Sequence, residues 1–514
     1  MSNSRTSKLL SDLNQLKWKV VYKGIIIGFI SGILVTIYRY GIEYGTEIAK
    51  KAYAFLRHHP TYILPWLFLI AIVGFLIHQL IRLEPYAKGS GIPQVEGIIL
   101  FGMKMKWYTI LFVRFVAGII TSFFGVSLGR EGPSIQIGAC GSQTVTGVLS
   151  RNKLEKNYLI TAGASAGLSA AFNAPLSGII FALEEVHRSF SPNILIAATT
   201  SALVADVTSK YFFGLKPVFS FLKIPQLPIQ YYIWLLPLGI LSGFVGSITN
   251  KGLLGISLFY NKIPACLRPT LALLIALPCG LLIPQILGGG QSLIELSERA
   301  DTSFILLIIL FVTKLLFTCL CFGSGIPGGI FMPILSIGAL TGCIIGKSVM
   351  IVGLPSSYVV VFCVCAMAGT MSSSVKAPIT SILLMAEMTG SLVHLFPVAA
   401  VSLVALLTSD VLKISPIYEV LLDRLTLENK EQFKQQETGA IVEIPVELGS
   451  KIDGLKIMDI QWPTGTLVVG LKRGEKEFVP NGNTQVLHGD YLIILTSEQR
   501  YIELSHNLSS LCHK

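Results

Sequence analysis

Apolar residues gather into long blocks over most of the chain, and polar residues fall mainly between these blocks. Several blocks approach the roughly 20 apolar residues that a helix needs to cross a hydrocarbon core about 30 Å thick. The pattern therefore predicts a bundle of membrane-spanning helices. The clearest blocks are Gly24–Tyr38, Tyr62–Ile81, Tyr108–Phe124, Ile194–Ala205, Ile233–Val245, Leu271–Ile286, Phe304–Phe322 and Leu392–Leu407.

Other apolar blocks are short or are interrupted by Gly and Pro. Irregular backbone is tolerated at membrane depth only inside protein or beside a water-filled cavity, so the interruptions predict broken helices around such a cavity. The composition agrees with this interpretation. Of the 514 residues, 52% are hydrophobic and only 13% are charged, which is too little charge for the surface of a soluble protein of this length.

The N-terminal segment is basic, with Arg5, Lys8, Lys17, Lys19 and Lys23, and no small-residue cleavage site follows the apolar block after it. By the positive-inside rule, these cations predict a cytoplasmic N-terminus. The net charge of +11 is interpreted as loops that face an anionic leaflet, and not as a surface for nucleic acid.

The residue pattern changes after Leu427, where the long apolar blocks end. Residues 428–437 are polar and indicate a linker or a helix end. Short β-like runs follow, separated by turn signals, which predicts a small α+β or all-β domain that is cytoplasmic if the number of crossings is even. We therefore divide the chain into residues 1–426 and 427–514. The β-like runs are Ile441–Val446, Thr466–Leu471, Glu477–Val479 and Tyr491–Leu495.

The membrane part contains an internal repeat. Asn173–Val186 aligns with Lys376–Thr389 at an offset of 203 residues, and Gly129–Pro133 aligns with Gly329–Pro333 at an offset of 200. Duplicated halves are typical of transporters, whose sites lie at the repeat interface on discontinuous helices. The sequence leaves open whether the two halves are parallel or inverted.

Four glycine-rich segments each place Gly ahead of Pro near the start of an apolar run. Pro fits the first turn of a helix, and Gly lets the backbone approach a ligand closely. Helix N-termini attract anions through their N–H groups and partial positive charge, so several of them would hold a halide more loosely than a fixed Lys. For a single segment, an ordinary helix start or a packing glycine is the alternative. The segments are Gly89–Pro93, Gly129–Pro133, Gly323–Pro327 and Gly329–Pro333.

Three of these segments, GSGIP at Gly89–Pro93, GREGP at Gly129–Pro133 and GIFMP at Gly329–Pro333, resemble in this order the signature motifs of the CLC family of chloride channels and chloride/proton antiporters. The resemblance covers nearly the whole membrane domain. It implies an all-α polytopic membrane protein with two repeated halves and broken helices, and a homodimer with one pore per subunit. The expected partners are chloride, protons and the lipid bilayer, with no enzymatic activity, cofactor or nucleic acid.

The resemblance also implies a central anion site. The hydroxyls of Ser90 and Tyr418 and the backbone N–H groups of Ile330 and Phe331 would donate to the anion. Taken alone, Ser90 is also explained as a helix N-cap, and Tyr418 as an aromatic residue at the membrane interface. The remaining anion-binding positions expected are Gly91, Ile92, Gly129, Arg130 and Gly132.

Glu131 is the candidate gate. A carboxylate at a helix N-terminus in an apolar block is costly unless it has a function or a partner, and it could occupy an anion site itself until protonation removes its charge. The matching glutamate in the family is the external gate and proton acceptor. A salt bridge to the neighbouring Arg130 is the alternative.

Glu185 resembles the internal proton-transfer glutamate of the antiporter branch. A charge at a helix end that faces the cytoplasm and pairs with Arg188 is the alternative. Arg114, in an apolar run, should pair with a carboxylate or raise the potential of the pore. Glu96 and Glu387 are interpreted as buried, paired structural charges.

The C-terminal domain resembles the TrkA-C (RCK-C) module, through Ile441–Val446, Gly465–Gly470 and Gly489–Ile494. It is interpreted either as a cap that stabilises a dimer or as a sensor for a small-molecule ligand. The sequence thus favours a chloride/proton antiporter, expected in a bacterial inner membrane with both termini cytoplasmic.

Other functions are less well matched. A passive voltage-gated or pH-gated chloride channel of the same fold is the main alternative. Fluoride export is weaker, because fluoride-selective relatives lack the elements at Ser90 and Tyr418. An intramembrane hydrolase is hinted at only by Glu184 and Glu185, and a cation channel would need a carbonyl-lined filter that the sequence does not contain.

Overall fold

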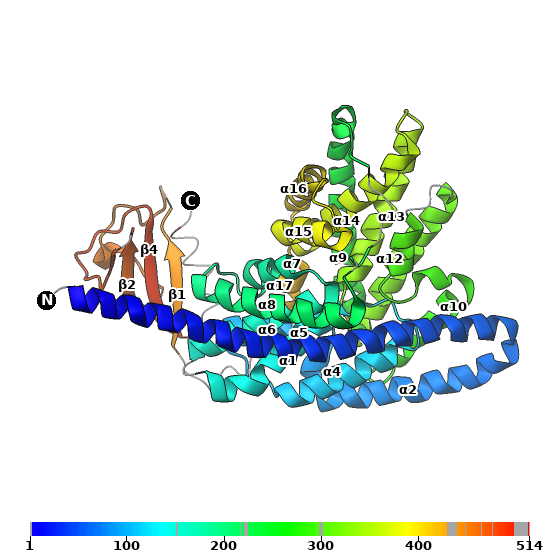
Figure 1. Ribbon diagram of the computed structural model, residues 1–514, viewed down its shortest axis with the longest axis horizontal. Coiled ribbons are helices and arrows are strands. Elements are labelled where there is room, and N and C mark those ends of the chain that lie inside the picture. Colours follow the sequence, from blue (N-terminus) through cyan, green and yellow to red (C-terminus); the bar gives the residue numbers. More distant parts are fainter. Residues whose placement is uncertain are drawn as a thin grey trace. The chain divides into compact units, whose positions relative to one another are not determined.

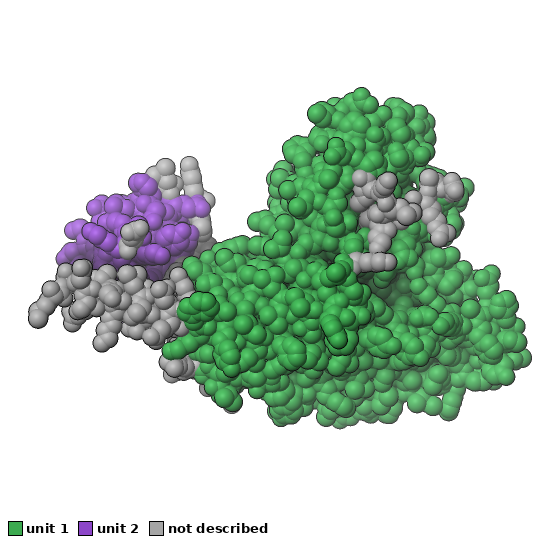
Figure 2. All heavy atoms as spheres, in the orientation of Figure 1, with its two compact units in different colours: residues 1–422 green, residues 423–514 purple. Residues whose placement is uncertain are grey.

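The protein, described here from a computed structural model, consists of two compact units, Met1–Leu422 and Asp423–Lys514 (Figure 2). The boundary predicted after residue 426 lies in the same helix as this division. The predicted linker lies, apart from Glu428, outside the described residues. The structure describes residues 3–150, 153–215, 217–219, 225–297, 302–428, 439–447, 449–463, 465–474, 476–497 and 512.

The first unit is helical, with two successive groups of eight helices followed by α17 (Ile417–Glu428) (Figure 1). Each of the eight predicted apolar blocks has most of its length in one of these helices. The first group is α1 (Asn3–His58), α2 (Ile63–Leu83), α3 (Ile92–Phe101), α4 (Trp107–Ser122), α5 (Glu131–Leu149), α6 (Lys153–Phe172), α7 (Pro175–Phe181) and α8 (Pro192–Phe213). The second group is α9 (Leu235–Asn261), α10 (Arg268–Leu282), α11 (Gln291–Ser297), α12 (Phe304–Gly323), α13 (Phe331–Met350), α14 (Val359–Val375), α15 (Pro378–Thr389) and α16 (Leu395–Val411).

Six helical segments in the described part of the chain are long and apolar enough to cross a membrane, judged by length and composition. Their burial differs widely although all are apolar. The apolar window of Pro60–Leu83 is only 17% buried, whereas that of Ser356–Val375 is 89% buried. The α2 helix therefore presents apolar side chains at the periphery, where a bilayer would cover them, while α14 lies in the protein interior.

Contacts between equivalent residues of the two helix groups indicate a pseudo-twofold relation. Gly129 and Gly329, which the repeat aligns, form an antiparallel bridge in which each N–H donates to the other's carbonyl at 2.7 Å. Reciprocal contact between equivalent residues is what a twofold axis produces. The helices that follow the two glycines, α5 and α13, therefore begin next to each other.

A second reciprocal contact joins α7 and α15. The Glu387 carboxylate accepts hydrogen bonds from the backbone N–H groups of Leu176 and Ser177, at 2.9 and 2.7 Å. The Glu184 carboxylate accepts from Ile379 N and Thr380 N, at 3.3 and 2.9 Å.

Each carboxylate also accepts from a hydroxyl, Ser177 Oγ for Glu387 and Thr380 Oγ1 for Glu184. Each half of the repeat thus caps a helix of the other half, which satisfies N–H groups that a helix start leaves unpaired. Glu387 is a structural charge, as the sequence suggested, and its partner is a helix N-terminus.

The second unit contains a four-stranded antiparallel sheet in the order β1-β4-β2-β3 (Figure 1). Alternate residues of β4, Leu492 and Ile494, form a small core with Ile444 of β1 and Leu471 of β2. The predicted β-like runs correspond to these strands. Their bounds are β1 (Gly439–Pro445), β2 (Thr466–Arg473), β3 (Lys476–Phe478) and β4 (Asp490–Ser497).

One of the four glycine-rich segments does not begin a helix, contrary to the prediction. The segment Gly323–Pro327 begins at the last residue of α12, and α13 begins only at Phe331. The segment and the residue after it instead contact the loop before α3, because Gly89 N donates to Gly325 O at 3.3 Å and Gly328 N donates to Gly89 O at 3.1 Å.

The reciprocal caps predict matched losses of stability. Glu387→Ala and Glu184→Ala should each lower the free energy of unfolding by about 0.5–2 kcal/mol, the usual cost of losing a helix cap. Thermal unfolding of the purified protein in detergent measures this. Glu47→Ala is the control, because Glu47 forms only an exposed pair with Lys51, which is worth about 0–1 kcal/mol. Equal melting curves for all three variants would contradict the capping role.

Candidate functional site

The N-termini of α5 and α13 converge at the Gly129–Gly329 bridge. A Cβ atom added at Gly329 would lie 2.9 Å from the Gly132 nitrogen, so the two helix starts are in contact. The residues at their N-cap positions, Arg130 and Ile330, give no side-chain cap. Helices of 19 and 20 residues therefore direct two positive dipole ends at one place.

Ser90 reaches this place from the loop before α3. It is 3% exposed, and a Cβ atom added at Gly132 would lie 2.5 Å from its hydroxyl oxygen. Its side chain does not cap α3, because Gly91 holds the N-cap position and Ile92 begins the helix. The N-cap interpretation of Ser90 is therefore wrong.

Tyr418 arrives from the first turn of α17 and is fully buried. Its ring stacks on Phe331, with 6.0 Å between centroids and 19° between planes. Its hydroxyl lies beside that of Ser90, and neither hydroxyl has a hydrogen-bond partner of ordinary geometry among the described residues. Complete burial excludes the interfacial-aromatic interpretation.

Glu131 is the first residue of α5 and is fully buried. Its carboxylate faces the backbone N–H groups of Glu131 and Met332 without a hydrogen bond of ordinary geometry to any described group. Arg130 forms its ion pair with Glu43 and not with Glu131. The carboxylate thus occupies the shared N-terminal region of α5 and α13, and the salt bridge between sequence neighbours is not formed.

Glu185 lies close enough to Tyr418 to act on it electrostatically, in the π-helical turn Ala182–Val186 that follows α7. It is 6% exposed, and within the described structure its Oε1 has no hydrogen-bond partner. Glu96 on α3 is fully buried and close enough for the two charges to repel.

Arg188 serves Glu96 and Glu419 instead of Glu185. Its guanidinium lies 3.7 Å from Glu96 and 4.0 Å from Glu419, while towards Glu185 it contacts only the backbone carbonyl, at 3.4 Å. The alternative in which Glu185 is a helix-end charge paired with Arg188 is therefore wrong, and the prediction that Glu96 is a paired charge is confirmed by its ion pair with Arg188.

The Ser90 loop is held by a buried cation. Arg114 on α4 donates to Gly89 O at 2.5 Å and to Ser90 O at 3.4 Å. No carboxylate in the described ranges lies within ion-pairing distance of it, so the predicted carboxylate partner is not found. The loop has the backbone that glycine allows, with φ of +67° at Gly89 and +99° at Gly91.

The second repeat also has a buried cation that holds a glycine loop by its carbonyls, and sequence reasoning missed it. Lys314 on α12 is fully buried and donates to Ile286 O at 2.9 Å and to Gly288 O at 2.7 Å. Gly288 and Gly290 repeat the backbone angles of the Ser90 loop, with φ of +64° and +98°. The signal was present, because Lys314 lies 200 residues after Arg114, the offset of the repeat.

The Gly288–Gly290 loop lines a cavity of about 480 Å³ that reaches Glu131 and Arg130. Further charged residues on α1 line it, of which Arg39 and Glu43 were also missed by sequence reasoning. Glu131 thus borders this cavity and is also close enough to Tyr418 to act on it electrostatically.

A family model described as "Voltage gated chloride channel" matches residues 67–410, and one described as "TrkA-C domain" matches residues 441–509. The chain is similar to the H(+)/Cl(-) exchange transporter ClcA of Salmonella paratyphi C (strain RKS4594), with 31% identity over 438 residues that cover 82% of this chain and 92% of the relative.

Two solved structures are similar as well. A slow cyanobacterial Cl−/H+ antiporter matches with a TM-score of 0.74 and 28% identity, over 80% of this chain and 98% of that one. A CLC-type fluoride/proton antiporter matches with a TM-score of 0.65 and 24% identity, over 78% and 96% of the two chains. At that lower identity the similarity shows the fold alone.

Because the Ser90 loop contacts α5 closely at Gly132, Gly→Ala should have opposite effects on stability at Gly132 and at Gly147. Gly132→Ala should cost about 1–3 kcal/mol of stability, because its methyl group would overlap the Ser90 hydroxyl and carbonyl. Gly147→Ala in the same helix has nothing within 4 Å and should gain about 0.5–1 kcal/mol. Thermal unfolding in detergent compares the two, and a neutral Gly132→Ala would contradict the described packing.

Proposed function

Because the chain belongs to the family of voltage-gated chloride channels, we propose that it is an antiporter that exchanges chloride for protons across a membrane. The observation that carries this proposal is the meeting of two helix N-termini at a buried carboxylate, Glu131. The similarity to exchange transporters over most of their length supports antiport.

In this proposal the anion is held mainly by main-chain dipoles. The Ser90 and Tyr418 hydroxyls and the N–H groups of Ile330 and Phe331 donate to it, and Gly91, Ile92, Gly129, Arg130 and Gly132 form the surrounding backbone. Burial of both hydroxyls without ordinary partners supports this assignment, because buried polar groups without partners are costly. Arg114 adds positive potential without contacting the anion.

Glu131 acts as the gate by competition. Ionised, its carboxylate takes the place of an anion at the start of α13. Protonated, it has no charge for the dipoles to attract, and it moves away so that chloride can pass. One proton taken up at Glu131 therefore accompanies the movement of chloride past it.

Glu185 passes protons between Glu131 and the other side of the membrane. Its burial near Glu96 supports this role, because burial and a neighbouring carboxylate both favour the neutral form of a carboxyl group. The alternative function is a passive chloride channel of the same fold, in which Glu185 would be structural. Fluoride transport is not favoured, because the structure of the fluoride/proton antiporter shares only the fold.

The remaining assignments concern the setting of the protein. We place it in a bacterial inner membrane with both termini in the cytoplasm, as the basic N-terminal segment favours. It acts as a homodimer with one pore in each subunit. The C-terminal sheet belongs to a TrkA-C domain, and we assign to it a small-molecule ligand that biases transport.

Chloride and proton fluxes measured together in proteoliposomes test the proposal. A chloride gradient should drive protons uphill in the wild-type protein, and a pH gradient should shift the reversal potential. In Glu131→Ala, chloride flux should continue while proton flux falls to background, because no titratable gate remains.

Glu477→Ala, on the exposed strand β3, is the control and should keep both fluxes. A wild-type reversal potential that ignores the pH gradient would favour the passive channel. Uphill proton pumping by Glu131→Ala would rule out the role of Glu131.

A further inference from the structure

The Arg130 guanidinium, which adjoins Glu131 along the chain, is held by a carboxylate from α1. Its Nη1 donates to Glu43 Oε1. Arg130 is 7% exposed, and its Nε has no hydrogen-bond partner among the residues described. Only one side of this buried guanidinium is therefore satisfied by protein, and the group that satisfies it is Glu43.

Glu43 is in turn fixed by a second arginine. Arg39 Nε donates to the same Glu43 oxygen at 3.2 Å. The Arg39 guanidinium carbon lies 3.9 Å from the centre of the Phe213 ring, and its Nη1 donates to Asn173 Oδ1 at 2.8 Å. The carboxylate is thus anchored through Arg39 to α8 and to the segment before α7.

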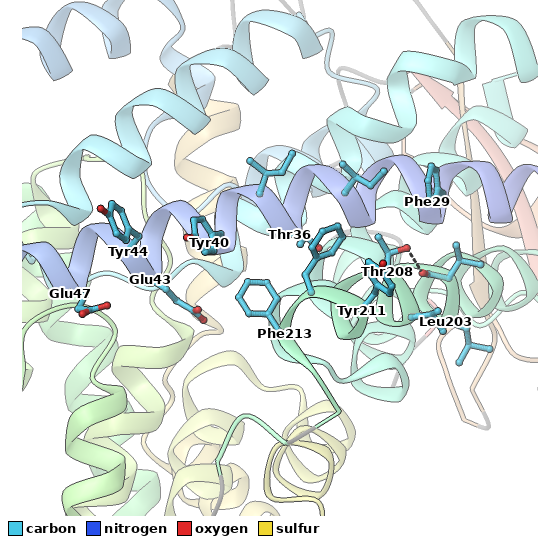
Figure 3. A pocket seen from close by; sticks show the side chains of 15 residues that line it. Phe29, Thr36, Tyr40, Glu43, Tyr44, Glu47, Leu203, Thr208, Tyr211 and Phe213 are labelled. Atoms are coloured by element: carbon cyan, nitrogen blue, oxygen red, sulfur yellow. Dashed lines mark hydrogen bonds between the residues drawn. The ribbon is translucent and has the colours of Figure 1, made fainter.

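The side chains show how this arrangement is oriented. Figure 3 shows Glu43 and Glu47 projecting from the same side of α1, with Phe213 of α8 near Glu43. Both carboxylates line the cavity that reaches Glu131. Only Glu43 contacts Arg130, since Glu47 pairs with Lys51 at 2.6 Å.

Other charged groups around the cavity are engaged elsewhere. Lys50 on α1 donates to Ser292 Oγ at 2.6 Å, and Glu295 on α11 accepts from Gln291 at 3.2 Å. Lys314 on α12 donates to two carbonyls of the Gly288 loop. Glu43 is therefore the only carboxylate, among the described residues, that forms an ion pair with the cation adjoining Glu131.

We propose that Glu43 is a positioning residue that holds Arg130 away from Glu131 and so sets the pH at which the gate opens. Without Glu43, a buried guanidinium would have Glu131 as the next available anion lining the same cavity. An ion pair between them would keep Glu131 charged to lower pH, because a nearby cation favours the ionised carboxyl group. The inference rests on the proposed function.

Glu43→Gln tests this by the pH dependence of chloride flux in proteoliposomes. The amide keeps the shape but cannot hold Arg130 by charge. The pH of half-maximal flux should move down by about one to three units, the usual effect of a cation placed next to a carboxyl group. Glu43→Asp, which keeps the charge, should restore much of the wild-type profile.

Two controls distinguish the positioning of Arg130 by Glu43 from the simple loss of one negative charge near Glu131. Glu47→Gln removes a carboxylate from the same helix and cavity, and should leave the midpoint within a few tenths of a unit. In an Arg130→Gln background, Glu43→Gln should produce little further shift, because the guanidinium that adjoins Glu131 is absent and Arg39 stays bound to Asn173.

An unchanged or raised midpoint in Glu43→Gln would overturn the inference, and so would an equal downward shift in the Arg130→Gln background. If Glu43→Gln does not fold, Glu43→Asn, which is also neutral, gives the same comparison in the presence and absence of Arg130→Gln. A wild-type protein that moves chloride without pH dependence would instead refute the proposed function, so the two failures are distinguishable.

Discussion

The approach of two helix N-termini, fixed by the Gly129–Gly329 bridge, is the constraint on which the rest of the structure depends. Each N-terminus has backbone N–H groups that no helical carbonyl satisfies, and together they concentrate positive potential inside an apolar protein. An anion or a carboxylate satisfies both the N–H groups and the positive potential. Glu131 meets the need from within the chain, and a halide would meet it from outside, which is why gate and substrate compete in the proposed mechanism.

Equivalent residues of the two repeats hold the loops near the two helix N-termini. Arg114 and Lys314 occupy equivalent positions and each holds a glycine loop by its carbonyls. A buried cation that donates to main-chain oxygens fixes a loop and raises the local potential without offering a halide a direct ion pair. A tight ion pair would slow release, so cations one layer behind the backbone suit a transported anion better than cations in contact with it.

Part of this arrangement could be predicted from the sequence, and the reasons for the rest are physical. Apolar blocks long enough for a bilayer identified the helices, and the spaced motifs identified Ser90, Glu131 and Phe331 through a family resemblance. Gly323–Pro327 was misjudged because Gly and Pro mark loops as often as helix starts. The Glu43–Arg130 pair joins residues 87 apart, and no local pattern encodes such a contact, whereas Lys314 could have been found by applying the repeat offset to Arg114.

The most direct test of the account is to locate the anion itself. A crystal structure of the protein grown in bromide would reveal the ion by its anomalous scattering. The account predicts a bromide within hydrogen-bond distance of the Ser90 and Tyr418 hydroxyls and of the backbone nitrogens that begin α13, with no lysine or arginine in contact. Bromide bound only to arginine or lysine side chains, with none at the helix N-termini, would contradict it.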